Sequence, residues 1–339
     1  MKVVTIGGGH GQAAMLRALL ELDCEVTAIV SIADDGGCSG RLRAEFDMPP
    51  PGDLRRCLST LARHRALAER FEERFEDEHE EDDLRRSAGN LALFDVYLER
   101  GSLVEAVRWA EDLLQCGGRV LPAADVPGQL TIYDESRGVL AGETIIEREG
   151  DRPVVVGVHG PEVAFREAKR AVAEAELLLL GPGSFVTSTL AAVMTGDLAQ
   201  AIVDTDADRV LVQNLAGEPG DPVQPTEGSA RDQLRLFRDH LCIGAGTDEF
   251  DLTVLAHGPR HERHQLDART FALRSPMVEP ACPSRHDHQR VAAALRHHFG
   301  LAARGRLDVF DDPEAIRQFE RRLASARARL RERASGRGA

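Results

Sequence analysis

The amino-acid sequence predicts an α/β fold with a doubly wound, mainly parallel sheet. Short apolar runs alternate with longer segments of helical periodicity, as in strand–helix–strand units. The runs at 25–33 and 175–181 are almost continuously apolar, which is typical of parallel strands buried on both faces. Polar, glycine-rich stretches follow several of these runs. Right-handed crossovers would bring those stretches together at one edge of the sheet.

The individual elements follow from the same patterns. The first strand is expected at 2–6, where KVVTI is rich in β-branched residues. Further strands are expected at 25–33, 175–181, 209–214 and 251–258, with a short last one at 306–310. Helical periodicity predicts helices at 12–22, 49–62, 87–99, 102–116, 161–175, 186–196, 228–242 and 287–299.

The stretch at 119–159 departs from this alternation. It holds four short strand-like patterns, RVLPAA, GQLTIYDE, GVLAGETIIERE and RPVVVGVHG, divided by Gly, Pro and Asp. This predicts a small antiparallel excursion within one domain that spans 1–311. Residues 312–339 are expected to form an Arg-rich C-terminal helix and tail that is solvated, with contact to an acidic partner surface as the alternative.

Composition excludes several classes of protein. The net charge is −14, so no overall basic field is available to attract nucleic acid. The six cysteines lack CxxC spacing, which favours a reduced, cytoplasmic chain. The first apolar run is too short for a signal peptide and no 18-residue apolar stretch is present, so neither a signal peptide nor a membrane span is expected.

The loop after the first strand is the first candidate site. Residues 9–14 fit GxGxxA, in which the backbone approaches a phosphate at a helix N-terminus. Backbone N–H groups of Gly8, Gly9, His10, Gly11 and Gln12 would hold the phosphates, and the His10 side chain could touch one. The alternative is a plain tight turn.

The loop after the second strand is the next candidate. Asp34 and Asp35 lie where a dinucleotide fold places a ribose-binding acid, and adjacent carboxylates can also hold Mg²⁺. Gly36, Gly37 and Ser39 follow and could form a second anion-binding nest. The alternative is a solvated turn, for which DDGG is ordinary chemistry.

Three other segments also combine a possible ligand role with a simpler one. Gly181, Gly183 and Ser184 begin a helix and could seat a second phosphate, although Ser184 also suits a helix cap. Asp53 and Asn90 lie near the starts of predicted helices, where each could face a ligand or simply help the helix to begin.

The histidines do not suggest a metal site. His257, His261 and His264 are expected in a polar, solvated loop, and His297 and His298 on a helix surface. No Ser–His–Asp signature and no P-loop lysine is visible.

Several long segments carry a resemblance to a known family. They are TIGGGHGQAAMLRAL, ADDGGCSGRLRAEFDMPPPGDLRRCLSTLA, SAGNLALFDVYL, LLGPGSFVTSTLAAV, QNLAGEPGD and SRHDHQRVAAAL. Together they resemble the YvcK, or gluconeogenesis-factor, family, which is related to CofD, the 2-phospho-L-lactate transferase of coenzyme F420 synthesis. The resemblance implies a Rossmann-like CofD fold and a homodimer. It also assigns Asn214 and Arg285 to the ligand site, since they match the family's strand-end Asn and its C-terminal Arg.

The resemblance also implies a function. It suggests a cytoplasmic regulator that binds a UDP-sugar, such as UDP-N-acetylglucosamine or UDP-glucose, and acts through protein partners in cell-wall or central carbon metabolism. Such a protein would be tied to cell shape and gluconeogenic growth. The alternative is a CofD-type phosphoester transferase with Mg²⁺ at Asp34 and Asp35. A weaker alternative is an NAD(P)-binding protein, which the first loop suits.

Overall fold

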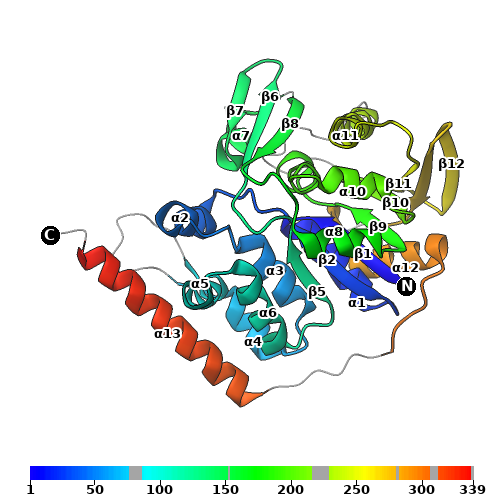
Figure 1. The fold of residues 1–339 in the computed structure, drawn as a ribbon. Helices are drawn as coiled ribbons and strands as arrows, with labels where there is room; N and C mark the ends of the chain where they lie inside the picture. The colour runs from blue at the N-terminus through cyan, green and yellow to red at the C-terminus, as the bar shows by residue number, and fades with distance from the viewer. Residues whose placement is uncertain (76–85, 152, 216–228, 280–281, 306–311, 337–339) are drawn as a thin grey trace.

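The computed structural model describes residues 1–75, 86–151, 153–215, 229–279, 282–305 and 312–336. One large sheet runs through the middle of the molecule, and helices cover both of its faces (Figure 1). A small antiparallel sheet stands out from this body, and a long C-terminal helix lies along another side. The predicted fold class is confirmed.

The main sheet has eight strands in the order β12-β13-β11-β10-β9-β1-β2-β5. All neighbours pair in parallel except β12, which is antiparallel to β13. The inner strands are buried on both faces, which explains their continuous apolar sequence. The strands are β1 (Lys2–Gly7), β2 (Glu25–Val30), β5 (Arg119–Pro122), β9 (Leu177–Leu180), β10 (Asp208–Val212), β11 (Leu252–His257), β12 (Glu262–Asp267) and β13 (Thr270–Ser275).

The strand order reverses direction beside β1. From β1 the chain proceeds to β2 and β5 on one side, then returns to place β9, β10 and β11 on the other. The junction between β1 and β9 is therefore the switch point, where open α/β sheets bind ligands at the carboxyl ends of their strands. The loops that follow β1 and β9 both lie at this point.

Two hydrophobic cores cover the faces of the sheet. Alternation along β1 sends Val3 into one core and Val4 and Ile6 into the other. The first core is built by α1 (Gly9–Leu20), α2 (Gly37–Phe46), α3 (Gly52–Leu61), α4 (Arg65–Glu72), α5 (Ala88–Arg100), α6 (Leu103–Leu114), α12 (His288–Phe299) and α13 (Pro313–Gly336). The second is built by α7 (Glu143–Glu149), α8 (Arg166–Ala173), the π-helical turn η1 (Phe185–Leu190), α9 (Ala191–Val193), α10 (Leu198–Asp204) and α11 (Ser229–Ala245).

The excursion at 119–159 is only partly as predicted. An antiparallel sheet in the order β7-β6-β8 is present, formed by β6 (Gln129–Asp134), β7 (Gly138–Ala141) and β8 (Pro153–His159). The segment RVLPAA, however, supplies β5 to the main sheet, where it pairs in parallel with β2. The end of GVLAGETIIERE forms helix α7 instead of a strand. Ile146 is the buried residue of this helix and packs against the second core, so the segment lacks the alternating burial of a strand.

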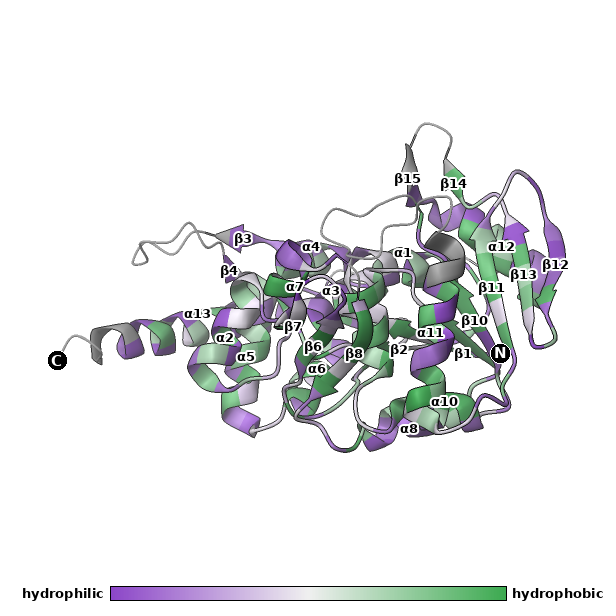
Figure 2. Cartoon of the chain, turned by 90° about the horizontal axis from the view of Figure 1, so that it is seen from above, coloured by the Kyte–Doolittle hydropathy of each residue, from purple (hydrophilic) through white to green (hydrophobic). Residues whose placement is uncertain are grey.

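The outer edge of the main sheet corrects another expectation. Residues 262–267 form the edge strand β12 instead of a polar loop. Its side chains are mostly exposed, and Figure 2 shows it largely hydrophilic beside the more apolar β11 and β13. A polar edge strand is protected against pairing with other chains. Two further pairs are β3 (Arg74–Phe75) with β4 (Arg86–Ser87) and β14 (Val278–Glu279) with β15 (Cys282–His286).

The C-terminal helix does not behave as a solvated tail. Helix α13 packs against the first core through Phe319 and Ala326, which are at most 1% exposed. The Phe319 ring stacks on Phe71 with their centroids 4.8 Å apart. The arginines that predicted a solvated helix include Arg322, which instead pairs with the buried Asp95 of α5. The predicted strand at 306–310 lies outside the described residues.

Among the described helices, none alone is long and apolar enough to cross a bilayer. The segments Phe185–Val193 and Leu198–Asp204 reach that length and composition only as a pair, and they are bent by 74° where they join.

Candidate functional site

The loops after β1 and β9 interlock at the switch point. A Cβ atom at Gly11 would lie 2.5 Å from the backbone nitrogen of Gly183 and from the carbonyl of Pro182. A Cβ at Gly183, where φ is +149°, would lie 2.8 Å from the carbonyl oxygen of Gly8. Gly181 joins its loop to the sheet by donating its N–H to Ile6. Glycine is therefore required where the two backbones touch.

A third strand end joins these two loops. The side-chain amide of Asn214, just after β10, donates to the carbonyl oxygen of Gly183 at 2.6 Å and accepts from the Gly183 nitrogen at 3.3 Å. The backbone N–H of Gly183 is thus bonded within the protein. Ser184 accepts from the Thr187 N–H at 3.4 Å and caps η1. The rest of the predicted loop, at 216–221, lies outside the described residues.

The backbone N–H groups of the loop after β1, which were expected to bind phosphate, are partly occupied by a side chain of the protein. The Asp53 carboxylate, from the first turn of α3, accepts the N–H of Gly9 at 2.8 Å. It occupies the N-terminus of α1, where a helix dipole and free amides favour negative charge. The Gln12 N–H bonds the Gly8 carbonyl oxygen at 3.4 Å. Among the expected donors, the amides of Gly9 and Gln12 are therefore satisfied internally, which corrects the expectation of a phosphate on every amide from Gly8 to Gln12.

The loop after β2 lies beside the start of α3. Gly36 donates its N–H to the Asp34 carboxylate at 2.8 Å, and Gly37 begins α2. A Cβ at Gly52, the first residue of α3, would lie 3.3 Å from Asp34 and 2.4 Å from the hydroxyl of Ser39. Asp34 is thus next to the turn that carries Asp53. The loops after β1, β2, β9 and β10 converge, although their role in binding stays a prediction.

Asp34 and Asp35 point to different neighbours. The Asp35 carboxylate accepts from the N–H and the hydroxyl of Thr144, at 2.9 and 2.8 Å, and so holds the start of α7. The predicted use of the two adjacent carboxylates as one metal-binding pair is not supported by this arrangement. Asp34 also lies close enough to Asp53 and Glu143 for these carboxylates to act on one another's ionisation.

Asp34, Asp53 and Glu143 form an acidic side of the site. Burial, with the nearby charge of Asp53, raises the pKa of Asp34 to about 6. Burial and the charge of Asp34 hold the pKa of Glu143 well above its usual range. Carboxylate oxygens suit Mg²⁺, which would relieve this repulsion. Among the described residues, these three carboxylates are not a group placed closely enough to hold a metal ion, so the fit to a directly coordinated ion is incomplete.

Glu143 was missed in the sequence because its segment was predicted to be a strand. The signals that favour a helix there are a glycine followed by an acid in the first turn. They are weak in a helix that spans only 7 residues.

We expect Asp34→Asn to stabilise the ligand-free protein at high pH. The folded state raises the pKa of Asp34, so it favours the protonated form over the carboxylate. Below the unfolded pKa of about 4, Asp34 is protonated in both states and does not lower the stability of the folded protein. As the pH rises through about 6, the buried side chain must become charged, and the folded protein loses stability. Asparagine is uncharged at every pH and keeps an acceptor for Gly36. The melting temperature in the presence of a chelator should exceed that of the wild type at about pH 8, and the difference should vanish toward about pH 4.

Asp23→Asn is the matched control. It removes an exposed carboxylate at the amino end of β2, away from the site. Its melting temperature should follow the wild type across the pH range. A constant offset for Asp34→Asn at all pH values would contradict the burial of a charged Asp34.

On the side of His10 the site opens into a groove whose described lining holds more arginines than carboxylates. The groove has a volume of about 2030 Å³, and its lining includes His10, Arg56, Asn214, Arg285 and His286. The positive charges of Arg56, and to a smaller extent Arg285, with partial burial, lower the pKa of His10. The exposed Arg285 thus lines the same groove as His10 of the first loop, and its role in ligand binding stays a prediction.

His286 was not assigned a role from the sequence. Burial and the nearby His257 lower its pKa to about 4, so the imidazole is neutral. Its Nε2 is buried without a hydrogen-bond partner among the described residues. His286 directly follows Arg285, and this position is the one feature of the sequence that could have identified it as a groove residue.

Two residues that were expected to contact a ligand, Gln12 and Asn90, have side chains buried inside the protein. The Gln12 side chain is fully buried and donates to the Thr5 hydroxyl and to the Ile29 carbonyl, both at 3.1 Å, so it ties β1 to β2. Asn90 lies in the first turn of α5, is 3% exposed, and is not among the described residues that line the groove. Its Oδ1 has no hydrogen-bond partner in the described structure.

Comparisons with known proteins agree with this geometry. The family model for 2-phospho-L-lactate transferase CofD matches residues 3–298. The chain is 34% identical over 246 residues to a gluconeogenesis factor of Bacillus subtilis, covering 72% of this chain and 76% of that one. It is 34% identical over 259 residues to a gluconeogenesis factor of Halalkalibacterium halodurans, covering 76% and 77%.

A solved structure shares the fold. The crystal structure of a UPF0052 family protein from Bacillus halodurans superposes with a TM-score of 0.75 at 28% identity, over 86% of this chain and 98% of that one. The sheet topology, the interlocked loops at the switch point and these matches lead to one assignment. The chain belongs to the CofD family and, within it, to the gluconeogenesis-factor (YvcK, UPF0052) proteins.

Proposed function

We propose that this gluconeogenesis-factor protein binds a nucleoside diphosphate sugar in the groove beside the switch point. The observation that carries the proposal is the division of the site into a basic and an acidic side. Arg56 and Arg285 line the groove together with His10, whereas Asp34, Asp53 and Glu143 are not among the described residues that line it.

The basic side suits a diphosphate. Guanidinium groups bind phosphate oxygens through paired N–H donors and stay charged at all relevant pH values. Arg56 is bonded to Asp53 at 2.8 Å, so its position is fixed, while Arg285 is exposed and has room to close on a ligand. The groove exceeds the volume of about 300–1,000 Å³ that a small-molecule pocket usually has, which leaves space for both a base and a sugar.

The position of Asp53 disfavours the NAD(P) alternative. Dinucleotide-binding proteins place the pyrophosphate at the N-terminus of the first helix. In this chain the Asp53 carboxylate takes the Gly9 N–H there, and a pyrophosphate would meet its negative charge. We therefore place the phosphates of a nucleotide sugar farther out, toward His10 and Arg285.

Isothermal titration calorimetry with UDP-N-acetylglucosamine, UDP-glucose, UDP and NAD⁺ tests the proposal. We expect a UDP-sugar to bind, and Arg285→Ala to weaken binding by about tenfold or more, because a charge-assisted contact is lost. Arg290→Ala, which removes an exposed arginine from the first turn of α12, is the control and should bind normally. Absence of UDP-sugar binding, or equal losses in both variants, would refute the proposal.

The acidic side favours a second candidate, a Mg²⁺-dependent phosphoester transferase of the CofD type. Bound Mg²⁺ would supply electrophilic stabilisation to a transferring phosphoryl group. Asp34 and Glu143 supply oxygen ligands of the right chemistry near Asp53. Asp34→Asn separates the candidates. A regulator keeps its UDP-sugar affinity in this variant, whereas a transferase loses its Mg²⁺-dependent turnover of a phosphoester donor.

A further inference from the structure

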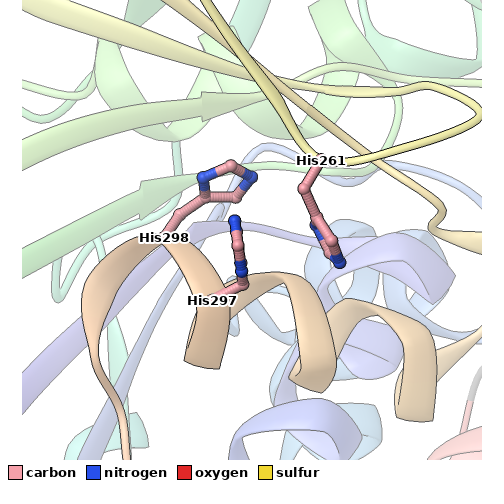
Figure 3. A group of neighbouring side chains, drawn as sticks. All are labelled: His261, His297 and His298. Carbon is pink, nitrogen blue, oxygen red and sulfur yellow. The ribbon is translucent and has the colours of Figure 1, made fainter.

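Three histidines from distant parts of the chain meet at the outer edge of the main sheet (Figure 3). His261 directly precedes β12, and His297 and His298 lie in the last turn of α12. One ring nitrogen of each histidine lies within 4.8 Å of those of the other two. The rings of His261 and His297 stack with centroids 4.1 Å apart, and the His298 ring stands nearly perpendicular to that of His297. The sequence placed these histidines in separate elements, a polar loop and a helix surface, and did not predict that they would meet.

A buried serine organises two of the three rings. The Ser275 hydroxyl, which is fully buried at the end of β13, contacts Nδ1 of His261 and Nε2 of His298, each at 2.8 Å. A hydrogen bond to one ring nitrogen fixes the ring orientation and the tautomer, and so directs the other nitrogen. Histidines at metal sites commonly have a supporting contact of this kind.

The cluster is also accessible from outside the protein. His261 and His297 are exposed and His298 is partly buried, so an ion can reach the cluster from solvent.

We propose that His261, His297 and His298 form a binding site for a divalent transition metal ion of the Zn²⁺ type. Three imidazoles suit zinc and its neighbours in the first transition row, whereas Mg²⁺ and Ca²⁺ prefer oxygen ligands. Zinc–nitrogen bonds of about 2.0–2.1 Å require tetrahedral ligand atoms about 3.3 Å apart, so the stacked rings must rotate toward one another.

Binding at this site would join two separate elements. The ion would link the start of β12 to the end of α12 and would leave at least one coordination position open. Because the linked arrangement exists only in the folded chain, zinc should raise the melting temperature in a concentration-dependent way. The site is independent of the groove and does not rest on the proposed nucleotide-sugar function.

Equilibrium dialysis of the untagged full-length protein against zinc sulfate, after treatment with a chelator, measures the stoichiometry. We expect about one zinc ion per chain, and a loss of affinity of about tenfold or more in His261→Ala and in His297→Ala. Co²⁺ provides a second readout, since its visible absorption bands report nitrogen ligation in a tetrahedral site. Circular dichroism confirms that the variants are folded, which is expected because both side chains are exposed.

His264→Ala is the matched control. His264 lies on β12 three positions from His261, is exposed, and contacts Glu262 at 3.1 Å instead of the cluster. It should bind zinc as the wild type does. Absence of zinc binding to the wild type would overturn the proposal. So would undiminished binding to the double variant His261→Ala/His297→Ala, because the ion would then be held elsewhere.

Discussion

Gly11→Ala is expected to destabilise the protein by about 1–3 kcal/mol, as overpacking in a tight interior does. Intrinsic propensity predicts the opposite sign, because alanine in a helix is favoured over glycine by about 0.8–1.0 kcal/mol. The new methyl group would lie 2.5 Å from the Gly183 nitrogen and the Pro182 carbonyl. These are backbone atoms, and Asn214 holds Gly183 in place through two hydrogen bonds. The loops cannot separate without breaking those bonds.

Urea denaturation and UDP-sugar titration measure the two consequences. The loss of stability should be accompanied by a loss of ligand affinity of about tenfold or more, because the groove begins at Gly11 and Pro182. Gly157→Ala is the control, since a Cβ there meets no atom within 4 Å. It should be neutral or slightly stabilising. A stabilised Gly11→Ala would show that the loops after β1 and β9 are not in contact.

The core of the fold could be predicted because its signals are local. The β-branched or leucine-rich runs at β1, β2 and β9 are long enough, and apolar enough, to identify buried parallel strands without knowledge of their partners. The switch-point rule then brings Gly11 and Gly183 to the same edge of the sheet. The convergence of these loops thus follows from strand type and crossover handedness.

The electrostatics of the site could not be predicted in the same way. Asp53 was recognised as a helix-start residue, but its partner is the N–H of Gly9, 44 positions away. Asp35 bonds Thr144 across 109 positions. Such contacts depend on how α3 and α7 pack on the sheet, and local periodicity carries no information about that packing.

The same reason explains the histidine cluster. His261 and His297 are 36 positions apart, and they meet only because β12 turns back antiparallel to β13. An edge strand with mostly exposed side chains has no apolar alternation, so its sequence resembles a polar loop. Because the sequence predicted a polar loop in place of β12, it gave no indication that His261 lies beside His297 and His298.

Removal of residues 313–339, which include helix α13, is expected to destabilise the rest of the chain by about 3–5 kcal/mol, the range for loss of a buried phenylalanine such as Phe319. Asp95 of α5 is 1% exposed, and α13 supplies three groups to its carboxylate. They are Arg322 at 3.0 Å, the Ser325 hydroxyl at 2.6 Å and Arg329 at 3.2 Å. Without the helix, Asp95 loses all three partners and becomes accessible to water, as does the apolar surface that packed against Phe319.

A cycle that combines Asp95→Asn with Arg322→Ala separates the charge effect from lost packing in the full-length chain. Each single change should lower the free energy of unfolding measured in urea, and the double change should cost less than the sum, because the remaining charge is no longer unpaired. Glu99→Gln is the control. Glu99 also pairs with Arg322 but is about half exposed, so its loss should change the free energy of unfolding little. Strictly additive losses for Asp95 and Arg322 would contradict a coupled pair. The helix would then be held by its apolar face alone, and the arginines of the C-terminal segment would have no specific role in docking it.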